Sequence, residues 1–161
     1  MKKVIFDTNI YGNIIIDEKS ELSKNKLNQF IIYGNKVIKN ELRNAPKKKD
    51  KYSKNLRMDL LRLYDDLVKH DLKITKEVIE LAENYYRIYK EFKGYIQYKK
   101  IINDFIIVAC ASLYKLDIVI SSDEKSMLSI NAVRAYNIVN EIKKLRTPDF
   151  INYEKFKRWL L

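Results

Sequence analysis

Four acidic residues that are far apart in the sequence occupy positions that an α/β fold would bring together. Asp7 and Asp123 stand at the C-terminal ends of two predicted parallel strands. Glu41 and Asp104 stand where we expect the first turns of two helices. The C-terminal ends of parallel strands share one edge of a sheet, and ligands bind in the crevice at that edge. We therefore expect the four carboxylates to converge there.

Such a cluster favours metal-dependent chemistry. Carboxylates held close together raise one another's pKa and repel unless they share a cation. Hard oxygen ligands select Mg²⁺ or Mn²⁺ over zinc, and one or two such ions suit phosphodiester hydrolysis. Taken singly, Asp7 and Asp123 could be turn or helix caps, and Glu41 and Asp104 could complement helix dipoles. Their joint placement favours the metal site.

Few other residues compete for a catalytic role. The single histidine, His70, stands next to Asp71 at a predicted helix end, so no nucleophilic triad is indicated. The sequence has no Gly-rich phosphate loop. Cys110, the single cysteine, lies in an apolar helical pattern and is predicted to be a core residue without a disulfide.

The composition is that of one compact domain, residues 1–161, with 47% hydrophobic and 33% charged residues. The excess of Lys and Arg gives a net charge of +11, which suits a polyanionic partner; the alternative is a Lys-rich surface that only confers solubility. No apolar run reaches the length of a membrane span, and no signal-peptide core is present. We therefore expect a cytoplasmic protein with no membrane association.

The hydrophobic pattern predicts an α/β fold. We expect strands at 4–6, 36–38, 72–74 and 117–121, an edge strand through Phe150, and helices at 21–33, 56–67, 76–92, 103–114, 127–142 and 153–161. Gly34 is expected to cap the first helix, and Phe156 and Trp159 are expected on the inner side of the last one. The stretch 43–57 is predicted to be a basic connection.

Four short motifs resemble those of PIN-domain nucleases, in order and at similar spacing. They are FDTN at 6–9, NELR at 40–43, NDFIIVA at 103–109 and ISSD at 120–123. The segment 127–154 also resembles a prokaryotic, VapC-like subgroup. The resemblance implies a three-layer fold with a parallel four- or five-stranded sheet between helices.

The resemblance also implies roles for individual residues. Asp7, Glu41, Asp104 and Asp123 would form a divalent-metal site, with Mg²⁺ or Mn²⁺, for the cleavage of single-stranded RNA. Asp7 and Asp104 would be the most direct ligands, Asp123 would ligate or hold a ligating water, and Glu41 would ligate or orient the attacking water. Side chains that would support this site are Thr8, Asn9 and Ser121.

Two alternatives remain at this point. The nuclease could be the toxin of a toxin–antitoxin pair, restrained by a small antitoxin protein, or the chain could be a non-catalytic RNA-binding module. A homodimer is also implied by the resemblance, with Trp159 or the Tyr-rich helices as its apolar surface. The aromatic residues Tyr85, Tyr86, Tyr89, Tyr95 and Tyr98, interleaved with Arg87, Lys90, Lys93, Lys99 and Lys100, could stack bases and hold phosphates, or the first three could be core.

Overall fold

A five-stranded parallel sheet forms the centre of the protein. The computed structural model describes residues 1–18, 24–45 and 55–160. The strands run in the spatial order β3-β2-β1-β4-β5, and every neighbouring pair is parallel. They are β1 (Lys2–Phe6), β2 (Phe30–Asn35), β3 (Val68–Leu72), β4 (Ile118–Ile120) and β5 (Asp149–Ile151). The predicted α/β class with a four- or five-stranded parallel sheet is confirmed.

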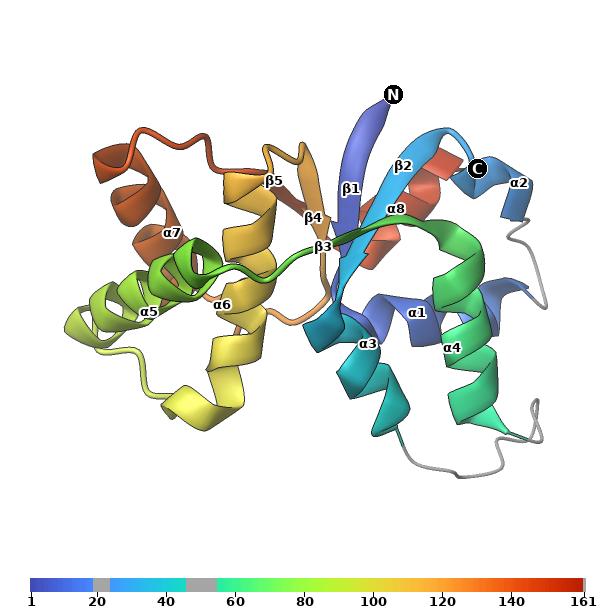
Figure 1. The fold of residues 1–161 in the computed structure, drawn as a ribbon, viewed down its shortest axis with the longest axis horizontal. Coiled ribbons are helices and arrows are strands. Elements are labelled where there is room, and N and C mark those ends of the chain that lie inside the picture. Colours follow the sequence, from blue (N-terminus) through green and yellow to red (C-terminus); the bar gives the residue numbers. More distant parts are fainter. Residues whose placement is uncertain (19–23, 46–54, 161) are drawn as a thin grey trace.

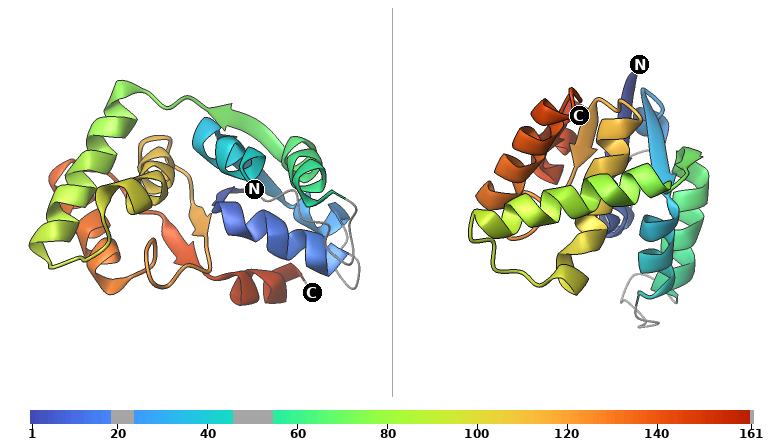
Figure 2. Two further views of the ribbon diagram at one scale, coloured as in Figure 1. Left: turned by 90° about the horizontal axis from the view of Figure 1, so that it is seen from below. Right: turned by 60° about the vertical axis from the view of Figure 1, so that its left-hand side comes forward.

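Helices cover both faces of the sheet. They are α1 (Thr8–Glu18), α2 (Lys24–Leu27), α3 (Lys36–Arg43), α4 (Leu56–Leu67), α5 (Lys76–Glu91), α6 (Tyr98–Leu113), α7 (Ile130–Ile142) and α8 (Tyr153–Leu160). Helices α5, α6 and α7 lie on one side, and α1, α4 and α8 lie on the other (Figures 1 and 2). Helix α3 continues from the C-terminal end of β2. No helix in the described part of the chain is long and apolar enough to cross a membrane.

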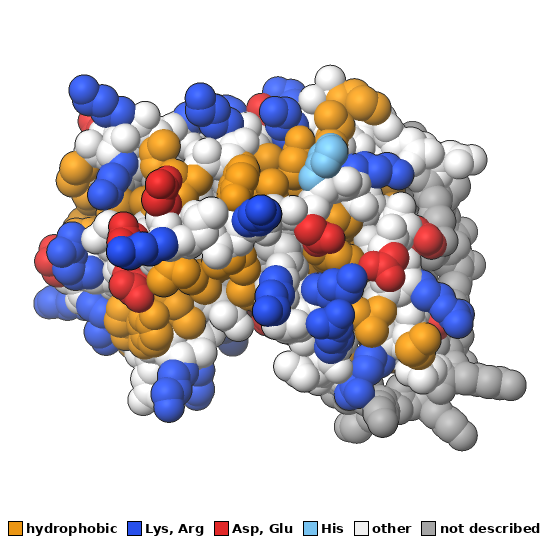
Figure 3. All heavy atoms as spheres, in the orientation of Figure 1, with side chains coloured by type: hydrophobic (Ala, Val, Ile, Leu, Met, Phe, Trp, Pro, Cys, Tyr) orange, Lys and Arg blue, Asp and Glu red, His pale blue; other side chains and the backbone are white. Residues whose placement is uncertain are grey.

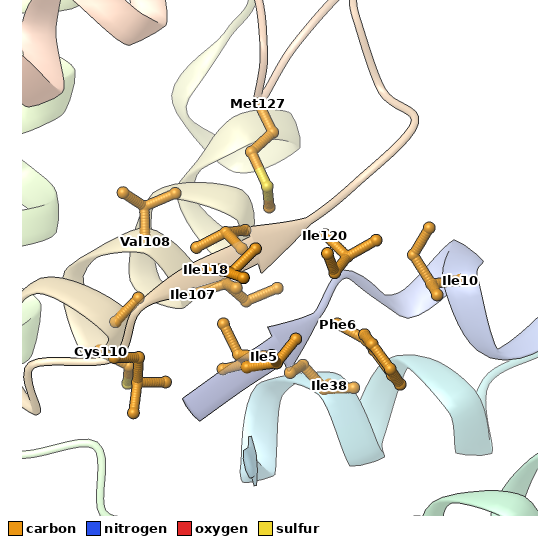
Figure 4. Close-up of a cluster of buried hydrophobic side chains, with 14 of the residues drawn as sticks. Ile5, Phe6, Ile10, Ile38, Ile107, Val108, Cys110, Ile118, Ile120 and Met127 are labelled. Carbon is orange, nitrogen blue, oxygen red and sulfur yellow. The ribbon is translucent and has the colours of Figure 1, made fainter. Parts of the chain in front are cut away.

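The core is built around β1, whose residues Val4, Ile5 and Phe6 are all buried. A strand covered on both faces reads as a continuous apolar run, which is the pattern seen at 4–6. Ile5 and Phe6 lie among side chains from β4, α1, α3 and α6 (Figure 4). Cys110 lies in this core, as predicted. The end of β1, and hence Asp7, is therefore fixed by packing.

The segment between β1 and α3 differs from the prediction. The helix predicted at 21–33 is present only as the short α2, and the strand predicted at 36–38 is wrong. Residues 30–35 form β2, and residue 36 begins α3; positions 21–23 lie outside the described residues. Apolar residues at 27, 30 and 31 fit a helical stripe, but pairing of β2 with both β1 and β3 overrides that local pattern. Asn35 then caps α3, because its side chain accepts a hydrogen bond from the Ile38 N–H at 3.0 Å.

Gly34 is a strand residue and not a helix cap. A Cβ at this position would lie 2.1 Å from the Tyr64 hydroxyl oxygen, so β2 passes the Tyr64 ring at a place where only glycine fits. The Tyr64 hydroxyl donates to the Asp71 carboxylate and lies 3.2 Å from the Asn35 carbonyl oxygen. The last residue of β3 is Leu72, so the strand predicted at 72–74 begins where β3 ends, and His70 lies in a strand rather than at a helix end.

The second half of the chain follows the prediction more closely. Helices α5 and α7, strands β4 and β5 and helix α8 lie at or near their expected positions. Phe156 is buried, as predicted, but the inward placement of Trp159 is wrong, since that side chain is 46% exposed. Most of the basic stretch 43–57 lies outside the described residues.

Candidate functional site

Asp7 is held at the end of β1 by three hydrogen bonds. Its N–H donates to the Ile120 carbonyl of β4 at 2.8 Å. Its carboxylate accepts from the Ser121 hydroxyl at Oδ2 and from the Thr8 N–H at Oδ1, both at 2.8 Å. The residue is only 5% exposed. The pairing of β1 with β4 thus places a nearly buried carboxylate in one orientation.

Asp104 and Asp123 meet at the hydroxyl of Ser126. Asp104 lies in the second turn of α6 and not in its first, because the helix begins earlier than predicted, at Tyr98. The Ser126 Oγ lies 2.8 Å from Asp104 Oδ2 and also contacts Asp123 Oδ2. The Asp123 carboxylate further accepts from the Ser126 N–H at 3.0 Å, which fixes the loop after β4. Ser126 therefore links α6 to that loop.

Ser126 is a residue that the sequence prediction missed. It is buried, and it stands three positions after Asp123, the spacing at which an Asp side chain accepts a hydrogen bond from a turn. That spacing is the available signal, but a serine in a loop has no other feature to single it out. The prediction included Ser121, which the structure places against Asp7, and Thr8, which it places against Glu41.

Glu41 joins the site from α3. It lies in the second half of this short helix rather than in a first turn, because α3 begins directly after β2. The Thr8 hydroxyl donates to Glu41 Oε1 at 3.2 Å. Thr8, Asn9 and Glu41 also line a small pocket between α1 and α3. All four predicted carboxylates thus lie at the C-terminal edge of the sheet.

The carboxylates perturb one another's ionisation. Burial and the negative charge of Asp7 raise the pKa of Asp104 to about 8, with smaller contributions from Asp123 and Glu41. Burial also raises the pKa of Asp7 and of Glu41, against the hydrogen bonds that these groups accept. The site therefore disfavours a full complement of negative charge unless a cation is present.

The bridging hydroxyl is consistent with this ionisation. A serine hydroxyl has one hydrogen, so Ser126 can contact two carboxyl groups as a hydrogen-bonded bridge only if one of those groups is protonated. Asp104, whose pKa is raised to about 8, is the group that carries the proton at neutral pH. Within residues 1–18, 24–45 and 55–160, no three His, Cys, Asp or Glu side chains are arranged to hold one metal ion.

The residues nevertheless fit a hard divalent cation. All four side chains offer carboxylate oxygens, the donors that Mg²⁺ and Mn²⁺ prefer. A divalent charge would relieve the repulsion that raises the pKa of Asp104. Loss of the Asp104 proton would also break the Ser126 bridge, which leaves oxygens of Asp104 and Asp123 available for a shared ligand.

The tyrosine-rich helices divide into core and surface. Tyr85 and Tyr89 are buried, and the Tyr85 hydroxyl donates to Asn140 at 2.6 Å, so these rings are not available for stacking on bases. Tyr95 and Tyr98 are 76% and 41% exposed, before and at the start of α6. Most of the apolar stripe on α5 is therefore structural.

Comparison with known proteins identifies the class to which this fold and site belong. The family model described as PIN domain matches residues 4–133, which is most of the chain. The chain therefore belongs to the PIN domain family, as the sequence motifs predict, and PIN domains are generally nucleases.

Several solved structures have the same fold. They include VapBC2 from Rickettsia felis bound to a promoter DNA fragment, with a TM-score of 0.55, 12% identity and coverage of 94% of this chain and 98% of that chain. VapBC-1 from nontypeable Haemophilus influenzae has a TM-score of 0.56 and 13% identity, with coverage of 94% of this chain and 98% of that chain. FitAB bound to IR36 DNA has a TM-score of 0.52 and 13% identity, with coverage of 92% of this chain and 94% of that chain. No curated protein sequence matches the chain. At these identities the likeness shows the fold.

Proposed function

We propose that this PIN-domain protein is a divalent-metal-dependent endoribonuclease that hydrolyses phosphodiester bonds in single-stranded or structured RNA. The observation that carries the proposal is the placement of Asp7, Glu41, Asp104 and Asp123, from four distant segments, at one sheet edge, where burial and neighbouring carboxylates raise the pKa of Asp7, Glu41 and Asp104. The net charge of +11 suits a polyanionic substrate.

Each residue has a distinct part in this mechanism. Asp7, Asp104 and Asp123 would hold Mg²⁺ or Mn²⁺, which when bound activates water and stabilises the leaving oxygen. Ser121 and the Thr8 N–H keep the Asp7 carboxylate in place. Glu41, which accepts a hydrogen bond from the Thr8 hydroxyl, would orient the attacking water and accept its proton.

A cleavage assay on labelled single-stranded RNA tests the proposal. We expect cleavage with Mg²⁺ or Mn²⁺, none in EDTA, and none by Asp7→Asn. The matched control is Asp149→Asn, since Asp149 is an exposed acid at the start of β5 with one weak ion pair to Arg146, at 3.9 Å. Cleavage that is indifferent to EDTA, or that Asp7→Asn retains at the wild-type rate, would show that the metal mechanism is wrong.

A second candidate function is that of a toxin held in check by an antitoxin. The structures of similar fold are VapBC and FitAB proteins, two of them bound to DNA fragments. On this proposal the nuclease is cytoplasmic, a small antitoxin covers the acidic crevice, and the chain forms a homodimer, for which exposed Trp159 is one candidate contact. Growth arrest on expression alone, relieved by co-expression of a short upstream reading frame, supports the toxin; normal growth with active enzyme contradicts it.

The non-catalytic alternative makes a different prediction. A PIN-fold module that only binds RNA would bind equally well with and without metal and would cleave nothing. Four mutually repelling carboxylates have no evident use in such a module, because they repel the RNA phosphates as well. The same assay, run with a binding measurement in EDTA, separates the two.

A further inference from the structure

A basic groove lies along α3, the helix that carries Glu41. It encloses about 640 Å³ between α3 and the segment that leads from β3 into α5. The residues that give it its character are Lys36, Lys39, Arg43, Leu72, Lys73 and Ile74. Figure 3 shows a hollow in the molecule between the surface over α5 and α6 and the surface over α3, with Lys and Arg side chains on the α3 side of its mouth.

The cations of this groove are arranged as one row. Lys36, Lys39 and Arg43 are spaced three and four residues apart on α3, so they share a face of the helix and extend over about 10 Å. Lys39 is held by Asp65 at 3.3 Å. Lys36 and Arg43 are exposed, and none of their contacts in the described part of the chain is with a carboxylate.

The opposite wall adds one cation and one acid. Lys73 is exposed at the end of β3, and Asp71 is the acidic residue of the groove. The Asp71 carboxylate accepts a hydrogen bond from the Tyr64 hydroxyl, so part of its acceptor capacity is occupied. Leu72 and Ile74 provide an apolar surface between the charges. The groove thus combines excess positive charge with a small apolar area, which suits phosphates and the faces of sugars or bases.

Helix α3 connects the groove to the candidate site. It carries Glu41, which lines the pocket towards α1, and on its opposite face it carries the row of cations that lines the groove. A cluster of carboxylates repels a phosphodiester strand, so a strand that reaches it needs positive charge elsewhere on the same protein surface. We propose that the groove binds backbone phosphates of single-stranded RNA on the side of α3 away from Glu41, outside the acidic site; this rests on the proposed ribonuclease function.

An equilibrium binding experiment tests the groove separately from cleavage. A fluorescein-labelled single-stranded RNA oligonucleotide is titrated with the full chain in EDTA, where the proposed cleavage cannot occur, at several salt concentrations. The test variant is Lys36→Gln/Arg43→Gln/Lys73→Gln. The control is Lys143→Gln/Lys155→Gln/Arg158→Gln, which removes the same charge from exposed positions near the end of α7 and on α8.

The expected result is specific to the groove variant. Its affinity should be on the order of 10-fold weaker, and the slope of log affinity against log salt should fall by about 2, since each phosphate contact with a single strand contributes about 0.7. The control should match the wild type. Circular dichroism on both variants shows whether they are folded, and single substitutions at Lys36 and Lys73 replace the triple variant if it is not.

Three results would overturn the proposal. If both triple variants weaken RNA binding to the same extent, only the net charge of the protein matters. RNA binding that neither variant weakens would place the RNA elsewhere. Binding of a labelled polyglutamate peptide, but not RNA, in a manner that depends on the groove would assign it to an acidic protein partner. If binding behaves as expected and no RNA is cleaved with Mn²⁺, the groove stands and the ribonuclease proposal fails.

Discussion

The three aspartates and Glu41 are held in different ways, although they share one edge of the sheet. Asp7 and Asp104 belong to elements that pack on the central core, and hydroxyls of Ser121 and Ser126 fix their carboxylates and that of Asp123. These contacts link β1, α6 and the loop after β4. Under the proposed function these aspartates would form the cage that holds the cation, once the contact between Ser126 and Asp104 is released.

Glu41, by contrast, stands on a helix of 8 residues and accepts its hydrogen bond from Thr8 alone among the described side chains. The same helix presents the row of cations to the basic groove. Under the proposed function this difference predicts a division of labour: the aspartates would determine metal binding, and the α3 side would determine how substrate and water approach the metal. Variants of the two sides test whether metal binding can be separated from the approach of substrate and water.

After Asp7→Asn, which should abolish cleavage, the largest expected effect is that of Asp104→Asn. Loss of one ligand charge removes several kcal/mol of transition-state stabilisation, so cleavage should fall on the order of 1,000-fold. Binding of Mn²⁺, measured by isothermal titration calorimetry, should fall with it. Full activity at saturating Mn²⁺ would show that Asp104 is not part of the cage.

Asp104 should also make the metal-free protein less stable as pH rises. Its pKa is about 8 in the folded protein against an ordinary value of 3.8, so between these values the folded state binds more protons than the unfolded state. The free energy of unfolding therefore falls from about pH 4 to about pH 8. Denaturation in EDTA should show Asp104→Asn stabilised relative to the wild type at pH 8 and much less so at pH 4; parallel profiles would contradict a raised pKa.

Glu41→Gln tests the other side of the comparison. If Glu41 orients and deprotonates the attacking water, cleavage should fall on the order of 100-fold while the Mn²⁺ affinity changes little. The calorimetric titration used for Asp104→Asn measures both variants under one set of conditions. Should Glu41→Gln lower the Mn²⁺ affinity as much as Asp104→Asn does, the division of labour is wrong.

Two glycines test how closely the α3 side is packed. Gly34→Ala places a Cβ against the Tyr64 ring and should destabilise the protein by about 1–3 kcal/mol, because the ring is held by Asn35 and Asp71. Gly12→Ala, in α1 with nothing within 4 Å of the new Cβ, should stabilise it by about 0.5–1 kcal/mol. Urea denaturation measures both, and a stabilised Gly34→Ala would mean that β2 and α4 pack loosely.

Ser126→Ala should affect the metal less than Asp104→Asn does. Removal of a group that orients two ligands should weaken Mn²⁺ binding by about 10-fold. Ser122→Ala serves as the control, since the exposed Ser122 hydroxyl accepts only a long hydrogen bond, 3.4 Å, from the Tyr153 N–H. Equal Mn²⁺ affinity in the two variants would remove Ser126 from the cage.

The sequence predicts those parts of the fold whose local pattern agrees with their surroundings. The run at 4–6 reads as a buried strand, and α5 carries both an apolar stripe and the Thr75 cap, so each is identifiable without knowledge of its neighbours. The acids at 7 and 123 follow from the strands that precede them. Strands β1 and β4, and the acids that follow them, are therefore predictable.

The missed parts depend on contacts between distant segments. Residues 30–35 are apolar enough for a helix or a strand, and pairing with β1 and β3 decides the outcome. The resulting shift moves the start of α3 and hence the place of Glu41 within its helix. Ser126 is recognisable only after α6 and the loop after β4 are side by side. Local pattern cannot supply such information.

The most direct test is a crystal of the protein soaked with Mn²⁺ and measured at a wavelength where manganese scatters anomalously. We predict an anomalous peak between Asp7 and Asp104, with Asp123 turned towards it and the contact between Ser126 and Asp104 broken. A peak elsewhere, or none there at a Mn²⁺ concentration that supports cleavage, would contradict a metal site built from these carboxylates.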